Sequence, residues 1–378
     1  MKNYISAFLL LFLFSCHSSK KMTTRQWNLN KTIGDSWNTP NPIVSTYGRT
    51  LVDNNNDLIL IGSASYAEFT FTSDSCIVYL KNIAYPGDYN YVVIELDNTY
   101  MGRLKVDGTE PKPYTIKSSA FNSSHLLRIF KATESHNGQV AITSVKATGL
   151  KAVDHPLKKK IEFIGNSITC GMASDTKDIP CGTGKWYDQH NAYLAYGPRI
   201  ARALNVDFML SSVSGIGIYR NWNSTAPTMP QVYESAYLDI DSTQRWDFSK
   251  YTPDVVSICL GTNDFSDGDG KTARLPFDSA SFISHYIDFV GMIYKHYPST
   301  QVALLTSPMI SGAKGDLLFA CLQTVKGRCH DLYPGKAGIE ILRLQPMVPK
   351  GCGYHPDIAD HEVLAKEMTP FFQKLLGK

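Results

Sequence analysis

The chain has little net charge, no pair of cysteines separated by two residues, and no internal repeat. Its 378 residues carry a formal charge of +3, and the lysines and arginines are scattered. No basic stripe therefore indicates a nucleic acid partner or an anionic membrane surface. The missing C-x-x-C pattern argues against a zinc ribbon or a thioredoxin-type site. Because 43% of the residues are hydrophobic and 19% are charged, we expect a folded chain with a substantial core, long enough for two domains.

Several familiar catalytic and cofactor motifs are incomplete. The segment 165–169 starts like the nucleophile elbow G-x-S-x-G but has Thr169 at its last position. His361 opens a zincin-like H-E pair that lacks the second histidine. The segment 182–185 lacks the rest of a phosphate-binding loop, and 215–217 lacks the third glycine of a dinucleotide fingerprint. These incomplete motifs are weak signals, and none of them indicates a metal or an organic cofactor.

The first residues contain no apolar run long enough for a stable transmembrane span. Lys2 precedes an apolar run over residues 5–14, which is followed by Ser15 and Cys16. A single positive charge, a short apolar stretch and a small residue are typical of a secretory signal. We therefore expect the protein to be exported.

The end of this signal, Leu13-Phe14-Ser15-Cys16, resembles a bacterial lipobox, in which the cysteine is lipidated and becomes the mature N-terminus. We predict a signal peptide with a lipobox cysteine over residues 1–16 and a linker over 17–27. The mature protein would be a lipoprotein, anchored through Cys16 in the periplasm or at the cell surface. The alternative is a plain cleaved signal followed by an incidental cysteine.

Seven cysteines remain besides Cys16, so at least one thiol must stay free even where disulfides can form. Cys259 lies in an apolar run and is expected to be buried as a small hydrophobic residue. Spacing does not fix the pairing of the others; Cys170 with Cys181 and Cys329 with Cys352 are trial assignments.

Residues 28–152 show the pattern of an all-β sandwich. Short segments of alternating hydrophobicity, such as Glu68–Thr72, Cys76–Leu80 and Tyr91–Leu96, are separated by turn residues. The turns Pro86–Asp88 and Asp107–Gly108 indicate hairpins.

Residues 153–378 follow a different pattern, in which short apolar strands alternate with longer helical stretches. This is typical of a parallel sheet covered by helices on both faces. The expected strands are Ile161–Ile164, Val206–Val213, Val255–Leu260, Val302–Leu305 and Ile339–Leu344, and the expected helices are Ala192–Leu204, Phe282–Tyr297 and His361–Leu376.

Polar residues follow three of these strands directly. They form the segments Gly165–Ser167, Ser214–Gly217 and Gly261–Asp264. Ligands of an open parallel sheet bind outside the carboxyl ends of its strands, so the sequence predicts a site built from these segments.

Ser167 could present its hydroxyl as a nucleophile at a strand-to-helix turn, provided that a general base lies beside it. The alternative is that Ser167 only caps the following helix. A base is available in His355, whose backbone Pro356 biases toward an extended conformation. A lone loop histidine is more often a surface residue, so the case for His355 depends on the other segments.

The four blocks of the GDSL/SGNH hydrolases resemble, in this order, Gly165–Ser167, Gly215, Gly261–Asp264 and His355–Pro356. More narrowly, the chain is similar to the acetyl xylan esterase-like enzymes of carbohydrate esterase family 2. The similar segments are Ile164–Gly171, Asn191–Leu194, Leu260–Phe265 and Gly351–Pro356, with Phe130–Glu134 at the end of the β domain. The resemblance implies an α/β SGNH-hydrolase fold, flavodoxin-like with three layers, preceded by a jelly-roll sandwich.

The resemblance also implies a role for each matching residue. Ser167 would attack an acetyl carbonyl and His355 would take its proton, while Gly215 N–H, the Asn263 amide and Ser167 N–H would hold the oxyanion. Relatives usually carry Asp where Asn166 stands, as a supporting residue for which Asn is a tolerable substitute.

A second departure concerns the base. Relatives often carry Asp two or three residues before the histidine, where this chain has Gly353 and Cys352. We therefore predict a Ser167–His355 dyad in which a backbone carbonyl, and no carboxylate of this loop, orients the imidazole ring.

For substrate binding we expect Trp222 and Tyr354 to stack on a sugar ring; ordinary packing under the loops is the alternative. The leading function is a secreted O-acetyl esterase acting on hemicellulose such as xylan or glucomannan, with sugar 6-hydroxyl acetates as the target that the resemblance implies. Two alternatives stay open: a carbohydrate-binding protein with a decayed hydrolase domain, and an esterase of lipids or thioesters.

Overall fold

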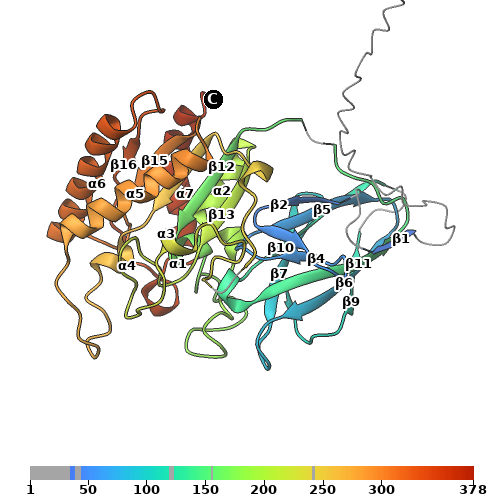
Figure 1. Ribbon diagram of the computed structural model, residues 1–378. Helices are drawn as coiled ribbons and strands as arrows, with labels where there is room; N and C mark the ends of the chain where they lie inside the picture. The colour runs from blue at the N-terminus through green and yellow to red at the C-terminus, as the bar shows by residue number, and fades with distance from the viewer. Residues whose placement is uncertain (1–34, 39–43, 119–122, 155, 241–242) are drawn as a thin grey trace, which may run out of the picture. The chain divides into compact units, whose positions relative to one another are not determined.

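The computed structural model describes residues 35–38, 44–118, 123–154, 156–240 and 243–378. The predicted signal peptide, its cysteine Cys16 and the linker lie outside these residues. The boundary predicted between residues 152 and 153 falls between the antiparallel strands and the parallel sheet (Figure 1). Within the described ranges, no helix is both long and apolar enough to cross a membrane.

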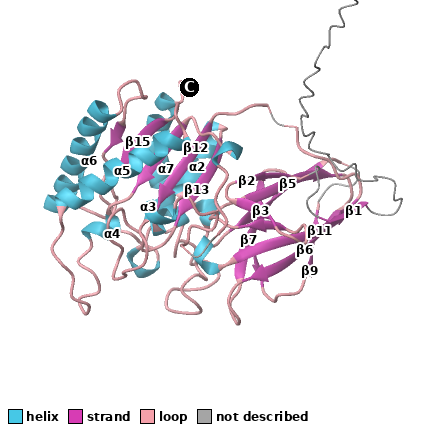
Figure 2. Cartoon of the chain, in the orientation of Figure 1, coloured by secondary structure: helices cyan, strands magenta, loops and turns pink. Residues whose placement is uncertain are grey.

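The N-terminal half consists of antiparallel strands in two sheets (Figure 2). The strands are β1 (Asp35–Asn38), β2 (Ser45–Tyr47), β3 (Thr50–Val52), β4 (Leu58–Leu60), β5 (Tyr66–Phe71), β6 (Ser75–Ile83), β7 (Asn90–Leu96), β8 (Thr99–Val106), β9 (Lys112–Lys117), β10 (His125–Lys131) and β11 (Gln139–Ala147). One sheet has the order β3-β4-β11-β6-β9 with β1 beside β11, and the other β2-β5-β10-β7-β8. Alternate residues of β6, such as Val78 and Leu80, pack with Phe69 and Ile129 of the opposite sheet in one core. The predicted sandwich is therefore confirmed.

Both predicted hairpins of this domain are wrong. The turn Pro86–Asp88 connects β6 of one sheet to β7 of the other, and Asp107–Gly108 likewise connects β8 to β9. The hairpin between β7 and β8 instead turns at Asp97 and Asn98, which both have positive φ. Turn residues reverse the chain, but the buried faces of the strands decide which sheet each one joins.

The C-terminal half is a parallel sheet with helices. Its strands are β12 (Lys160–Gly165), β13 (Asp207–Ser212), β14 (Val255–Cys259), β15 (Gln301–Leu305) and β16 (Glu340–Leu342). The α-helices are α1 (Ser167–Cys170), α2 (Tyr196–Leu204), α3 (Met229–Val232), α4 (Thr262–Phe265), α5 (Ser279–His296), α6 (Gly312–Leu332) and α7 (Ile358–Leu375), and the 3-10 helices are η1 (Ser135–Asn137), η2 (Ala192–Leu194), η3 (Phe248–Lys250) and η4 (Cys352–Tyr354). The strand order β13-β12-β14-β15-β16, with every neighbouring pair parallel, is the predicted flavodoxin-like arrangement.

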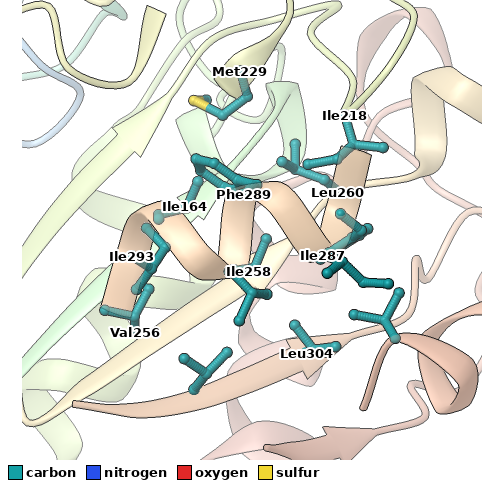
Figure 3. Packing of buried hydrophobic residues seen from close by; sticks show 14 of the residues in the cluster. Ile164, Ile218, Met229, Val256, Ile258, Leu260, Ile287, Phe289, Ile293 and Leu304 are labelled. Carbon is teal, nitrogen blue, oxygen red and sulfur yellow. The ribbon is translucent and has the colours of Figure 1, made fainter. Parts of the chain in front are cut away.

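The two faces of this sheet bury different sets of residues. On one face Ile164, Ile258 and Leu304 pack against α5 residues such as Ile287 and Ile293 (Figure 3). On the other face Phe163 and Ala303 join a cluster with Ile200 of α2 and Phe372 of α7. Neighbouring residues of one strand thus point to opposite helical layers, which makes the domain three-layered.

A buried polar network links the sandwich to the α/β domain. Arg49 Nε donates to Ser211 Oγ (3.0 Å), and its NH groups donate to the carbonyls of Ser235 (2.7 Å) and Tyr233 (3.0 Å). Glu162, in the middle of β12, accepts from Ser211 Oγ (2.6 Å) and Tyr233 OH (2.9 Å). Arg49 and Glu162 are both fully buried, so this network holds two opposite charges away from water.

Candidate active site

The register of the parallel sheet brings the predicted site residues to one edge. Gly165 at the end of β12 pairs with Ser212 of β13 and with Cys259 of β14. Ser167 and Gly215 lie two and three residues beyond these strand ends, and Asn263 lies four residues beyond Cys259. The predicted convergence at the carboxyl ends of the strands is therefore present in the structure.

Ser167 is the first residue of α1 but does not cap it. The cap is Asn166, whose side-chain oxygen accepts from Ile168 N–H (3.2 Å). The backbone folds back sharply here: a Cβ at Gly165 would lie 2.0 Å from Thr169 Oγ1, so only glycine fits. Because Asn166 satisfies the helix end, the Ser167 hydroxyl is left for another partner, and the capping alternative is wrong.

That partner is His355. Its Nε2 lies 2.8 Å from Ser167 Oγ, and its Nδ1 lies 2.8 Å from the carbonyl oxygen of Gly353. A carbonyl can only accept, so Nδ1 carries the hydrogen and Nε2 of the neutral ring accepts from the Ser167 hydroxyl. This is the tautomer that a general base for serine needs, and a backbone carbonyl orients it, as expected from the sequence.

Electrostatics keep this histidine neutral. Burial lowers the pKa of His355, while the backbone carbonyls of Gly353 and Cys352 and the charge of Glu134 oppose that shift. Burial also lowers the pKa of His190 well below its usual value and that of His361 to about 3. At neutral pH His355 can therefore accept a proton, and neither neighbouring histidine adds a positive charge.

Two further groups can hold an oxyanion. Gly215 has φ +76°, and an added Cβ would meet nothing within 4 Å, so the left-handed backbone and not lack of space favours glycine there. The Asn263 amide donates one hydrogen to the Ile216 carbonyl (2.7 Å), which leaves its second N–H available. Within the described residues, no group of three or more His, Cys, Asp or Glu side chains is arranged to hold a metal ion.

Comparison with known families agrees with this arrangement. Residues 163–334 match the GDSL-like lipase/acylhydrolase family, and residues 46–156 match the carbohydrate esterase 2 N-terminal domain. The chain belongs to carbohydrate esterase family 2. Membership places it among the carboxylic ester hydrolases of the GDSL/SGNH type.

Other members of family 2 are similar over most of this chain. This chain is 29% identical over 322 residues to the cellulase/esterase CelE of Acetivibrio thermocellus, and the match covers 83% of this chain and 37% of that protein. It is 26% identical over 336 residues to an acetylxylan esterase / glucomannan deacetylase of Cellvibrio japonicus, covering 84% and 90%. A solved family two carbohydrate esterase from Clostridium thermocellum, in complex with cellohexaose, superposes with a TM-score of 0.78 at 28% identity over 88% of this chain and 99% of that one.

Asp264 fixes Asn263 and Gly215, the two predicted oxyanion donors, relative to each other. Its buried carboxylate accepts from the backbone N–H groups of Ile218 (3.0 Å), Tyr219 (3.0 Å) and Arg220 (3.2 Å). Asp264 directly follows Asn263, so it ties α4 to the loop after Gly215. The sequence showed Asp264 within the polar segment but gave it no role.

The sandwich domain also contributes to the site. The Glu134 carboxylate accepts from Ser214 N–H (3.1 Å) and from the Ser214 hydroxyl, directly before Gly215. Lys131 Nζ donates to the Glu134 carbonyl (2.6 Å), and burial lowers the pKa of Lys131 to about 7. Both residues lie in the segment Phe130–Glu134, where the sequence carried the resemblance without indicating this contact.

The two predicted sugar-binding aromatics are exposed. The Trp222 side chain is 48% exposed, and its backbone N–H donates to the Gly215 carbonyl (2.8 Å); Tyr354, beside the base, is 84% exposed. Neither is packed under a loop as the alternative required. A third exposed ring, Trp186, packs edge-on against His190 with 4.9 Å between ring centroids and was not predicted.

Both trial disulfides are wrong, because the structure joins Cys181 to Cys352. Cys170 is buried in α1 with its thiol 3.2 Å from Ser212 Oγ, and Cys329 lies on the buried face of α6. The free cysteines of the described part are all buried: Cys76, Cys170, Cys259, Cys321 and Cys329. Burial of Cys259 was expected.

Proposed function

We propose that this protein is a secreted carbohydrate O-acetyl esterase that removes acetyl groups from hemicellulose through a serine acyl-enzyme. The observation that carries the proposal is the 2.8 Å contact between Ser167 Oγ and Nε2 of a histidine whose tautomer is fixed by Gly353. A hydroxyl beside a correctly oriented neutral imidazole is the minimum needed for acyl transfer.

Each step of the reaction has a group on this chain. Ser167 Oγ attacks the acetyl carbonyl while His355 Nε2 takes the hydroxyl proton. The carbonyl oxygen becomes negative between Gly215 N–H, Ser167 N–H and the Asn263 amide, and each well-placed donor stabilises it by about 3 kcal/mol. His355 then gives its proton to the leaving sugar oxygen, and the acetyl group stays on Ser167.

Deacylation uses the same groups in reverse order. A water molecule gives a proton to His355 and attacks the acetyl-serine carbonyl; acetate leaves and Ser167 regains its proton. An amide at Asn263 suits both steps because it donates hydrogen bonds without adding charge.

An acetylated polysaccharide is the proposed substrate. The relative from Cellvibrio japonicus, named an acetylxylan esterase / glucomannan deacetylase, supports xylan and glucomannan as polymers. Exposed Trp222, whose backbone contacts Gly215, and exposed Tyr354, next to His355 in the chain, would provide flat faces for a pyranose ring. The family resemblance points to acetates on the sugar 6-hydroxyl.

The proposal is tested by following the acetyl signals of acetylated glucomannan and acetylated xylan by NMR during incubation with the protein. We expect free acetate to accumulate and the 6-O-acetyl signals of glucomannan to disappear first. Binding of the protein to the polymer without release of acetate would favour the carbohydrate-binding alternative. Hydrolysis of long-chain esters alone would favour a lipid substrate.

Trp222→Ala should separate binding of the polymer from the chemistry. We expect KM for acetylated glucomannan to rise roughly five- to tenfold, because a stacking face is lost, while kcat/KM for p-nitrophenyl acetate stays unchanged. Leu332→Ala, which removes an exposed side chain at the end of α6, is the control. An equal loss on both substrates would show that Trp222 supports the site and does not bind sugar.

We also propose export with lipidation at Cys16, on the basis of the sequence Leu13-Phe14-Ser15-Cys16. In a bacterial host, wild type is expected in the membrane fraction and Cys16→Ser in the aqueous fraction, because a lipid chain adds about 0.8 kcal/mol of membrane affinity per buried methylene. Mass spectrometry of the mature N-terminus is the measurement. An unmodified N-terminus beyond residue 16 would support the plain cleaved signal.

A further inference from the structure

The loop that carries the base is linked covalently to a second loop. Cys352, three residues before His355, is bonded to Cys181, which lies 171 residues earlier in the segment between α1 and η2. The carbonyl that orients the imidazole ring belongs to Gly353, the residue directly after Cys352. The disulfide is therefore one residue away from the group that fixes the tautomer.

The backbone around this carbonyl is unfavourable on its own. Gly353 has φ +59° and Tyr354 has φ +61°. A left-handed conformation is accessible to glycine but is disfavoured for tyrosine, whose Cβ comes too close to the backbone. Residues in such conformations persist where surrounding contacts hold them. A loosened loop would rotate the peptide between these residues and move the Gly353 carbonyl away from His355.

The contacts that hold the loop converge on Cys352. Its N–H donates to the carbonyl of Ala173 (3.1 Å), and its sulfur is bonded to Cys181 in the same segment. On the other side Gly351 N–H donates to the His355 carbonyl (2.7 Å), and a Cβ at Gly351 would lie 2.7 Å from that oxygen. His355 N–H donates in turn to the Cys352 carbonyl (3.2 Å), so the disulfide acts together with several backbone hydrogen bonds to fix the loop.

We propose that the Cys181–Cys352 disulfide positions His355 for catalysis by holding the Gly353 carbonyl against the imidazole ring, and that reduction of this disulfide lowers the activity. The disulfide is a positioning element, because neither sulfur touches the reacting atoms. The inference rests on the proposed esterase function and adds a dependence on redox state to it.

The disulfide is placed where a reductant can reach it. Cys181 is exposed and Cys352 is half-buried, whereas the free cysteines of the described part are buried thiols. Dithiothreitol gives two electrons and two protons to the disulfide, which becomes two thiols, and is itself oxidised to a cyclic disulfide. Reduction of the folded protein therefore changes this one bond among the described cysteines.

The test compares wild type before and after dithiothreitol with the double variant Cys181→Ser/Cys352→Ser, using p-nitrophenyl acetate. We expect reduction to lower kcat ten- to hundredfold with little change in KM, because the base is misplaced while the acetyl site remains. Reoxidation should restore the rate. The double variant should be as slow as reduced wild type and insensitive to dithiothreitol, which makes it the matched control.

The pH profile separates positioning from stability. Burial, the larger influence, holds the pKa of His355 below its usual 6.5, so the acid limb of kcat/KM in the oxidised protein should lie below 6.5. In a loosened loop, loss of burial raises the pKa of His355, while loss of the Gly353 contact lowers it. Because burial is the larger influence, we expect the acid limb to move to higher pH. Glu134, His190 and His361 are the titratable groups that interact with His355, and all three are present in both forms.

An unchanged kcat and acid limb in reduced, folded wild type would overturn the inference, even if its melting temperature fell. Circular dichroism establishes that the reduced protein is folded. Failure of the esterase proposal is a different outcome: oxidised wild type would then show no hydrolysis at all.

Discussion

Replacing Ser167 with alanine is expected to lower kcat/KM for p-nitrophenyl acetate by at least about 10,000-fold. Ser167 Oγ is the proposed atom that forms the acyl bond, and it lies 2.8 Å from Nε2 of His355. Gly215 and Asn263 would remain, so the residual rate would reflect the oxyanion donors acting on a water molecule. Steady-state hydrolysis over a range of enzyme concentrations measures this change.

Two comparisons make the Ser167 result specific. Ser299→Ala removes an exposed hydroxyl in the turn before β15, at the other end of the sheet, and should leave the rate unchanged. His355→Ala should be nearly as slow as Ser167→Ala, and the double variant no slower, because the two residues act as a unit. A Ser167→Ala protein that keeps more than about a tenth of the activity would exclude Ser167 as the nucleophile.

Replacing Arg49 with methionine is expected to reduce the free energy of unfolding by about 3–5 kcal/mol, because it leaves the buried charge of Glu162 without its counter-charge. Arg49 also satisfies the carbonyls of Tyr233 and Ser235, which methionine cannot do. Urea unfolding followed by circular dichroism measures the loss.

The pH dependence of this loss has a definite sign. Burial already raises the pKa of Glu162 above its ordinary 4.5, and Arg49 opposes that shift. Without Arg49 the pKa of Glu162 in the folded state rises further. The Glu162 carboxyl then holds its proton more tightly in the folded state than in the unfolded state. The contribution of protonated Glu162 to the stability of the variant is therefore retained below pH 4.5 and is lost as the pH rises. The loss of unfolding free energy relative to wild type should be larger at about pH 8 than at about pH 5.

A double variant distinguishes the charge from the packing. Arg49→Met/Glu162→Gln removes both charges and should be more stable than Arg49→Met alone, because an uncharged amide is cheaper to bury. If the double variant loses as much unfolding free energy as Arg49→Met and Glu162→Gln lose in sum, the two charges are not coupled. The interpretation of the network would then be wrong.

Strands were easier to predict from this sequence than helices. The five parallel strands were found within about two residues of their ends, because Val, Ile and Leu follow one another where both faces are buried. Helix α6 was missed, although Leu318, Leu322 and Val325 recur at helical spacing and Cys321 and Cys329 continue the same buried face. The helix predicted over Ala192–Leu204 divides into η2 and α2 at Ala195, whose backbone is extended.

The positions of the candidate site residues were predictable only where these residues follow strand ends. Ser167, Gly215 and Asn263 had that signal, and His355 was found through its order in the chain and the family resemblance. Glu134 and the Cys181–Cys352 disulfide were not predictable, since contacts between loops far apart in sequence depend on tertiary structure that spacing does not encode.

The most direct test of a Ser167–His355 acetyl esterase is acetate release from acetylated xylan and acetylated glucomannan by wild type and Ser167→Ala in parallel. We predict release by wild type from at least one polymer and none by the variant, which would show that a dyad oriented by a backbone carbonyl is sufficient. Equal release by both proteins, or no release by folded wild type from either polymer or from an aryl acetate, would contradict it.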